Sequence, residues 1–278
     1  PIATYCYQPM LKQPTIKIIP GSPHRYIAII PSLIKCGEKF SLKIKGEDIW
    51  GNPSDKCNID FFLNPSIPVK NLPKKISLKS GSFSKIIDKL QVDHDKELFI
   101  NFCDNDGNIK FSSNISKVES NPGYKLFWGD LHGQSEETIG TGSAEHYFLF
   151  ARDRAFLDVT SHQGNDFQMT KEFWETLNKL SSKYTVDNEF VIIPGYEWSG
   201  NTALGGDRNV FFPNEGRTIR RSSHAMISDQ TDIENDCHTA TDLFEAFAKN
   251  KEFDVLGYAH CGGRYADINF AHDSRFEK

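Results

Sequence analysis

Four predicted strands in the second half of this sequence each run into a side chain that can bind a metal ion. These side chains are His132, His162, Glu197 and His260. Because the carboxyl ends of parallel strands meet at one face of an α/β fold, residues roughly 130 positions apart can converge there. Neutral imidazoles and carboxylates are the ligands that zinc, manganese and iron use in proteins. The pattern therefore predicts a divalent-metal site, and two such ions would support a hydrolytic reaction.

Further polar side chains flank these four positions. Asp130 could orient the His132 imidazole, and Gln134 could supply an amide oxygen as a further metal ligand. Arg208 follows two glycines and an aspartate, and its guanidinium could bind phosphate oxygens in a fork, which makes it a candidate catalytic residue beside His132 and Glu197. An ion pair of Arg208 with a nearby carboxylate is the alternative. The residues expected to support the ligands or contact substrate are Asp130, Gln163, Asp207 and Arg264.

The second half of the chain alternates predicted strands with predicted helices. Ser143 and Thr170 are predicted helix N-caps, because each precedes a run with apolar residues at helical spacing. The predicted strands cover 125–129, 156–160, 190–193, 209–212 and 254–258, and the predicted helices cover 143–155, 170–182 and 242–249. Repeated β–α units predict a mostly parallel sheet, either open or closed into a barrel.

The first half of the chain has a different pattern. Short apolar runs, some alternating with polar residues, are separated by turn residues, and no helical period is present. This pattern predicts a β-sandwich over residues 1–121, followed by the α/β domain over residues 122–278. Residues 46–53 resemble a turn of immunoglobulin-like accessory modules, which favours an immunoglobulin-like sandwich.

Composition excludes several classes of protein. The 278 residues carry a net charge of −5, which gives no support to a broad nucleic-acid or membrane-binding surface. No apolar run is long enough to cross a membrane. The six cysteines form no Cys-x-x-Cys pair, which favours buried free thiols and slightly favours a reducing compartment such as the bacterial cytoplasm. A Cys36–Cys57 or Cys57–Cys103 disulfide is the alternative for an exported protein.

Several motifs resemble the PHP superfamily, the polymerase and histidinol phosphatase metal-dependent phosphoesterases. Residues 130–135, Asp-Leu-His-Gly-Gln-Ser, resemble its opening Asp-Leu-His-x-His-Ser signature, and residues 161–163, Ser-His-Gln, resemble its Thr-Asp-His motif. Glu197 stands where the family has a metal-bridging glutamate, and His260 in His-Cys-Gly-Gly resembles His-Pro-x-Gly. The stretch from Phe127 onward is similar to a PHP-like branch with an N-terminal β domain.

The resemblance implies a distorted β/α barrel that binds two or three divalent ions, zinc, manganese or iron. A metal-bound hydroxide would attack a phosphate ester, and His132, His162, Glu197 and His260 would be ligands. Gln134 replaces the second histidine of the opening signature, and Ser161 replaces an aspartate, so fewer ions are expected here. The function predicted is a metal-dependent hydrolase of a small anionic substrate, a phosphate ester or a related anion. The alternatives are a metal hydrolase of a different substrate and a non-catalytic metal-containing binding protein.

The length of the second domain predicts an incomplete barrel. Tyr124 to Lys278 comprises 155 residues, whereas a β/α barrel typically needs about 250. The late ligands of the superfamily have no counterpart after His272. We therefore expect a C-terminally truncated barrel, with the chain a fragment of a longer protein and its unfinished edge available for oligomer formation.

Overall fold

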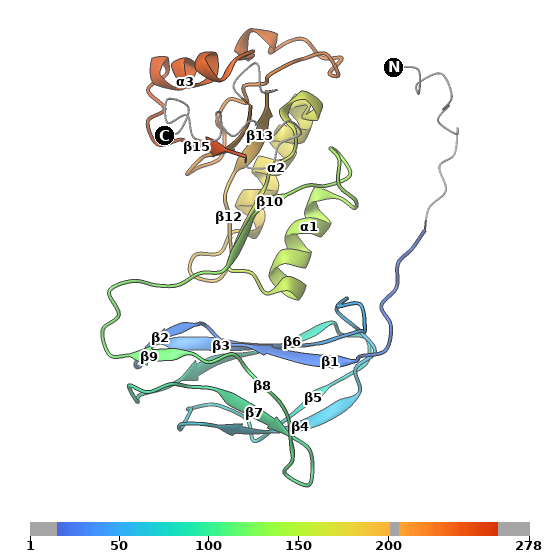
Figure 1. Ribbon diagram of the computed structural model, residues 1–278, viewed down its shortest axis with the longest axis vertical. Coiled ribbons are helices and arrows are strands. Elements are labelled where there is room, and N and C mark those ends of the chain that lie inside the picture. The colour runs from blue at the N-terminus through green and yellow to red at the C-terminus, as the bar shows by residue number, and fades with distance from the viewer. Residues whose placement is uncertain (1–15, 201–205, 261–278) are drawn as a thin grey trace. The chain divides into compact units, whose positions relative to one another are not determined.

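The computed structural model describes residues 16–200 and 206–260, and it divides the chain into two compact units, 1–123 and 124–278 (Figure 1). The first unit contains only strands in its described part, whereas the second mixes strands and helices. This confirms a mixed α/β protein with a β-rich N-terminal region, as the sequence predicts.

The described part of the N-terminal unit consists of three sheets. Strands β1, β3 and β6 form one antiparallel sheet, β5, β4, β7 and β8 form a second, and β2 and β9 pair in parallel. Their bounds are β1 Arg25–Ile29, β2 Leu33–Lys35, β3 Lys39–Glu47, β4 Ile59–Pro65, β5 Lys75–Leu78, β6 Ser84–Gln91, β7 Ile100–Cys103, β8 Ile109–Ser112 and β9 Lys117–Glu119.

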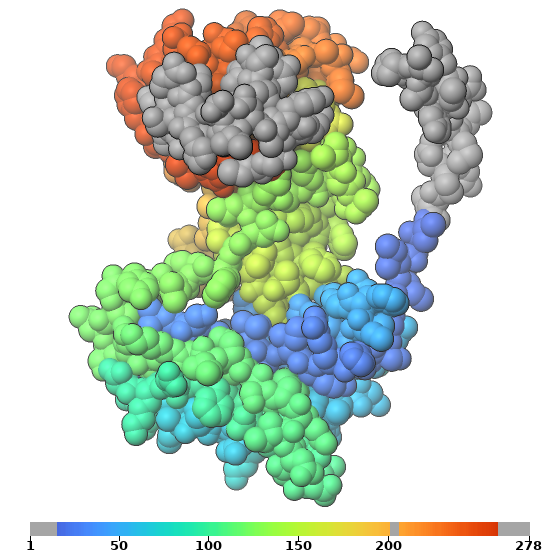
Figure 2. Space-filling view, in the orientation of Figure 1, coloured from blue at the N-terminus to red at the C-terminus, as the bar shows by residue number. Residues whose placement is uncertain are grey.

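One apolar core joins these sheets. Leu42 and Ile44 alternate with partly exposed residues along β3, and both are fully buried. They belong to the same cluster as Phe61 of β4 and Phe102 of β7, whose rings meet edge to face. Two sheets that share a core form a sandwich, and the space-filling view shows the outer surface of this unit, coloured blue to green (Figure 2). The narrower assignment to the immunoglobulin-like class stays a prediction.

The C-terminal unit contains two three-stranded sheets of different kinds. Strands β10, β11 and β12 are parallel, whereas β13, β14 and β15 are antiparallel. The strands are β10 Gly129–Gly133, β11 Val159–His162, β12 Val191–Ile192, β13 Gly195–Ser199, β14 Asp207–Phe211 and β15 Leu256–Ala259. The α-helices are α1 Ala144–Phe150, α2 Lys171–Tyr184 and α3 Ala240–Lys249, with a π-helical turn Ala151–Ala155 and 3₁₀ turns Asp166–Gln168 and Ile233–Asn235.

The expected mostly parallel sheet is wrong, and the expected incomplete β/α barrel is not confirmed. Within residues 16–200 and 206–260 no closed barrel is present, and half of the strands in the second unit run antiparallel. The physical reason is that apolar periodicity reports which side of a strand is buried, not the direction in which the strand runs. Strand β13, which the sequence does not predict, pairs antiparallel with β14 in register from Gly195 with Phe211 to Ser199 with Asp207.

Two of the three predicted helix starts are confirmed. Ser143 caps α1 by accepting from the backbone N–H of His146, and Thr170 caps α2 by accepting from that of Phe173. The third helix begins earlier than predicted, because Thr239 forms a reciprocal capping box with Asp242.

The cysteines in the described part of the chain are free thiols. Cys57, Cys103 and Cys237 are buried, and Cys36 is half-buried. Neither of the two alternative disulfides is formed, in agreement with the favoured interpretation of buried thiols.

In the part of the chain that the structure describes, no helix has both the length and the apolar character needed to cross a membrane.

Candidate metal centre

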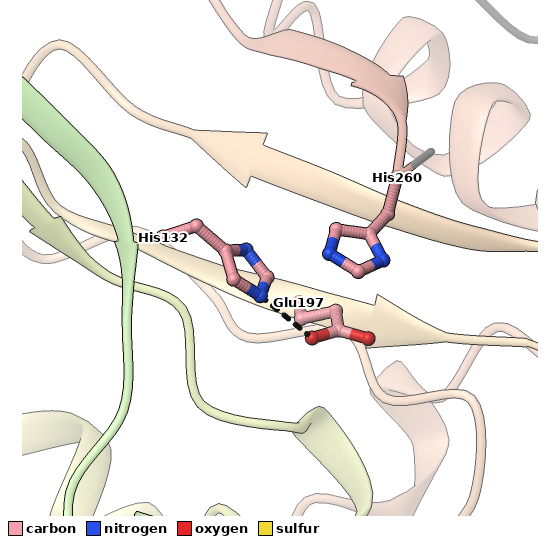
Figure 3. Close-up of side chains that lie close together, drawn as sticks. All are labelled: His132, Glu197 and His260. Atoms are coloured by element: carbon pink, nitrogen blue, oxygen red, sulfur yellow. Dashed lines mark ion pairs between the residues drawn. The ribbon is translucent and has the colours of Figure 1, made fainter. Parts of the chain in front are cut away.

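Three of the predicted ligands converge in the second unit. His132, Glu197 and His260 each offer a ligand atom, and these atoms all lie within 4.8 Å of one another. His132 lies on β10, Glu197 on β13, and His260 directly follows β15. Figure 3 shows the two imidazoles and the carboxylate directed toward a common position.

The antiparallel sheet explains how two of these side chains reach the same face. Directly opposed residues of neighbouring strands share a face, and Glu197 lies opposite Asn209, which lies opposite Tyr258. His260 follows Tyr258 by two residues, so it projects on that face as well, and its backbone N–H extends the ladder by donating to the carbonyl of Asp207. The side chains that alternate with Glu197 along β13 point to the other face, into the apolar core.

The backbone of His132 is shaped by a local irregularity of β10. The register with β11 shifts between Asp130 and Gly133, and the Asp130 carboxylate accepts the backbone N–H of His132 at 3.1 Å. Asp130 therefore contacts the backbone of His132 and not its imidazole, in contrast to the prediction from sequence. The imidazole Nε2 lies 3.5 Å from Glu197 Oε2, and Nδ1 lies 2.8 Å from Asn209 Oδ1.

The surroundings of His260 favour its neutral ring. The rings of His132 and His260 stack with centroids 4.3 Å apart and an angle of 25° between planes. Burial lowers the pKa of His260, and the neighbouring His132 lowers it further. Neutral imidazoles are the form that ligates metals.

The triad fits a divalent ion on its own chemistry. Two imidazoles and one carboxylate are a donor set of catalytic zinc sites, in which three protein ligands leave a position for substrate. Glu197 is 5% exposed, and His260 Nδ1 is buried without a hydrogen-bond partner within residues 16–200 and 206–260. A buried polar atom without a partner is costly, and a bound cation would remove that cost.

His162 lies outside this group. It is 2% exposed, its Nδ1 accepts the backbone N–H of Gly164 at 3.1 Å, and its Nε2 lies 2.8 Å from the hydroxyl of Ser135. Burial lowers the pKa of His162 to about 4, so the ring is neutral near pH 7. Both ring nitrogens are occupied by protein groups, and the structure does not bring this predicted ligand to the triad.

The remaining predicted residues at the ends of β10 and β11 are also engaged in protein contacts. Gln134 Oε1 accepts the hydroxyl of Thr138 at 2.8 Å, and the Ser161 hydroxyl donates to the Ile193 carbonyl at 2.8 Å. Gln163 donates to Ser161 Oγ at 3.1 Å. These contacts close a loop or join neighbouring strands, and they involve no member of the triad.

Arg208, the predicted anion clamp, is not brought to the triad. It is fully buried and pairs with Trp198 across β13 and β14, so it lies on the face opposite to Glu197 and Asn209. Asp207 lies on the triad face and accepts from His260 through its backbone carbonyl. Arg264 lies outside the described residues.

Sequence reasoning missed Asn209. This residue is 4% exposed, and it contacts the imidazole of His132 from the strand that runs beside Glu197. A signal is present in the sequence, because Asn209 is a polar residue at the start of an apolar run. The signal alone does not identify a site residue, because the direction of the side chain depends on the antiparallel pairing.

Comparison with known proteins gives little beyond distant sequence relatives. No family model matches the chain. An uncharacterized protein of Chlamydia pneumoniae is 26% identical over 95 residues, which are 34% of this chain and 15% of that protein. Uncharacterized proteins of Chlamydia trachomatis and Chlamydia muridarum are each 21% identical over 192 residues, 68% of this chain and 31% of theirs. The chain thus matches less than a third of the length of these relatives.

One solved structure, titled a structure of PhoD, covers 74% of this chain and 44% of its own, at 11% identity and a TM-score of 0.25. A TM-score this low carries no argument about fold or function. The assignment to the PHP superfamily is therefore not confirmed by these comparisons and rests on the motifs alone.

Proposed function

We propose that this chain forms the metal-binding part of a hydrolase that acts on a phosphate ester or a related small anion. The observation that carries the proposal is the convergence of His132, Glu197 and His260 from three separate strands to within 4.8 Å. The PHP-like motifs around these three residues support the choice of a phosphorylated substrate. Zinc, manganese or iron would suit the donor set.

Such an ion, when bound, would polarise the scissile bond and lower the pKa of a water molecule. The residues of the chain contribute electrostatics and orientation. Glu197 supplies the single negative charge of the triad, and the two neutral imidazoles supply none, so a divalent ion held by these three groups keeps a net positive charge. That charge attracts an anionic substrate, and the buried position of Glu197 strengthens the effect by lowering the local dielectric.

A second candidate is a metal hydrolase of a non-phosphate ester or amide. The specific observation in its favour is the placement of Arg208 on the opposite face of the sheet, which removes the predicted phosphate clamp. The two-histidine, one-carboxylate donor set is also that of zinc enzymes that cleave carbonyl compounds.

The first test is metal content and metal affinity of the untagged chain, measured by inductively coupled plasma mass spectrometry and isothermal titration calorimetry. We expect about one equivalent of divalent metal in the wild type, because the triad offers three ligands for one ion, and a loss in the His132→Ala variant. His94→Ala is the matched control, because His94 is an exposed histidine of the N-terminal unit. An absence of metal after reconstitution would overturn both candidates.

Turnover then separates the two candidates. Hydrolysis of a phosphomonoester panel that disappears in the His132→Ala variant would support the first proposal. Hydrolysis of carboxylic esters alone, with the same dependence on His132, would support the second and overturn the first.

A further inference from the structure

We infer that Asn209 is a positioning residue that fixes the tautomer of His132 and thereby directs the Nε2 lone pair to the metal position. The inference rests on the proposed function, since it assigns a role to Asn209 within the same triad. Its geometric basis is the 2.8 Å contact between His132 Nδ1 and Asn209 Oδ1.

The chemistry of the two groups determines where the proton lies. A neutral imidazole carries one N–H, and a carboxamide oxygen can only accept a hydrogen bond. Because Asn209 Oδ1 faces Nδ1, the proton of His132 must be on Nδ1. Nε2 is then unprotonated, and its lone pair is available for a metal.

The contact on the other side of the ring explains why this tautomer favours a bound cation. Nε2 of His132 lies 3.5 Å from Glu197 Oε2. In this tautomer both atoms are acceptors, and two acceptors that face each other repel. A cation bound by both atoms converts the repulsion into attraction, which is what a metal site requires.

The sheet gives Asn209 the rigidity that a positioning residue needs. It lies on β14, the central strand of the antiparallel sheet, and it is paired with Glu197 on one side and with Tyr258 on the other. Its backbone cannot shift without breaking ladder bonds on both sides. The same strand pairing that places Glu197 therefore also places the acceptor that orients His132.

A second histidine provides an internal comparison. Nδ1 of His162 accepts the backbone N–H of Gly164, so in its neutral form the proton of His162 lies on Nε2 and is directed to Ser135. The structure thus holds His132 and His162 in opposite tautomers. Of these two rings, only that of His132 has a free lone pair on Nε2.

The tautomers can be measured without any metal. We would record ¹⁵N-histidine NMR spectra of the metal-free chain at about pH 8, where an ordinary imidazole is neutral. The His132→Ala and His162→Ala variants assign the signals. The expected result is an Nδ1–H tautomer for His132 and an Nε2–H tautomer for His162. An Nε2–H tautomer or a doubly protonated ring at His132 would overturn the inference.

Metal affinity gives the second readout. Asn209→Leu keeps the side-chain size but removes the acceptor, and loss of such a partner typically weakens metal binding about 10–100-fold. Asn209→Asp retains an acceptor at the same position, so its affinity should stay within about threefold of the wild type or increase. Asn101→Leu is the matched control, because Asn101 is a strand asparagine in the other unit whose Oδ1 accepts the hydroxyl of Ser112.

The outcomes are separable. Equal affinities of the wild type and the Asn209→Leu variant would overturn the positioning role even if the metal site is real. An absence of metal in the wild type would overturn the proposed function, while the tautomer of His132 would still decide the inference. If Asn209→Leu fails to fold, the wild-type spectrum and the Asn209→Asp affinity still test it.

Discussion

The two units of this protein bury different kinds of side chain. In the N-terminal sandwich the buried residues of the described chain are mostly apolar, and six polar or charged residues are buried with them; in the second unit sixteen polar or charged residues are buried. The second unit also holds buried polar atoms that lack a partner in the described chain, on Gln163, Asn165 and His260. The sandwich is held mainly by its apolar core, whereas the second unit combines an apolar core with extensive polar burial, part of it at the triad.

The difference indicates where function lies. Buried polar groups reduce stability unless they are paired, and proteins retain them mainly where they position a site. Part of this polar burial lies at the triad, because Glu197 and Asn209 share one face of one sheet and Asn165 forms a β-bridge with Glu197. Variants that change stability without metal affinity, or metal affinity without stability, test this division.

The largest effect is expected from truncating the core of the sandwich. Phe102 is fully buried and stacks on Phe111 at 4.3 Å, so Phe102→Ala should destabilise the N-terminal unit by about 3–5 kcal/mol. Hydrogen exchange of peptides from β7 would measure the change. Phe62→Ala is the control, because Phe62 is 39% exposed and should cost less. A parallel fall in metal affinity would show that the two units are not independent.

Removing the charge of the triad should weaken metal binding without lowering the stability of the metal-free protein. We expect Glu197→Gln to weaken metal binding by about 100-fold or more, which is about 2.7 kcal/mol. The metal-free variant should be as stable as the wild type or more so, because the introduced amide can donate to His132 Nε2 and remove the contact between two acceptors. Calorimetric titration and thermal melting measure the two quantities. A variant that loses stability but keeps its metal affinity would contradict the assignment.

His162 should behave as a structural residue and not as a ligand. His162→Asn leaves Ser135 or Gly164 without its partner, and we expect a loss of about 1–3 kcal/mol in stability. Metal affinity should stay within about threefold, since the side chain is not part of the triad. A fall in metal affinity comparable to that of His132→Ala would instead restore His162 to the ligand set.

The smallest expected effect is the pH dependence of stability. It comes from two buried groups whose contributions change in opposite directions with pH. Burial raises the pKa of Asp166 to about 6, above the usual value near 4. Between these two pH values the folded state therefore binds more protons than the unfolded state. The contribution of Asp166 to stability falls as pH rises from about 4 to 6. The pKa of His162 is lowered to about 4, so its contribution falls as pH drops from about 6.5 to 4. The two contributions nearly cancel in the wild type.

Asp166→Asn should expose the histidine contribution. The variant should lose stability toward acid by roughly 1 kcal/mol per pH unit more than the wild type between about pH 6 and 4.5. Asp166 accepts the backbone N–H groups of Ser199 and Ser222, and an asparagine amide cannot accept both. Absolute stability will therefore fall at every pH, so the slope of stability against pH is the relevant quantity. Identical slopes in thermal melts of metal-free wild type and variant would show that Asp166 does not titrate in this range.

Much of the local structure can be predicted from the sequence. Ser143 and Thr170 are recognisable as helix caps because a side-chain oxygen before an apolar periodic run satisfies the free N–H groups of a first helical turn. The alternation of Phe40, Leu42 and Ile44 identifies a strand with one buried face. The three residues of the triad are recognisable as candidate ligands because each lies at or near the end of a predicted strand.

The incorrect predictions of site residues share one cause. Arg208 and Asn209 are neighbours in the sequence, and either could face the site; the pairing of β13 with β14 places Asn209 beside Glu197 and turns Arg208 to the core. His162 satisfies the same sequence pattern as the triad histidines, yet its ring nitrogens are occupied by Gly164 and Ser135. Neither outcome can be derived from periodicity, because both depend on which segments pair over long sequence distances.

The sequence by itself therefore determined most of the elements but not β13, together with two helix caps, the two-part composition and the set of residues able to bind a metal. Those features depend on local propensity and on the period of apolar residues, which a single chain displays directly. Only the tertiary structure decided which members of that set meet, on which face of the sheet they project and which ring nitrogen of each histidine is free. These depend on strand direction and register, and a shift of one residue in register would exchange the face of Asn209 for that of Arg208.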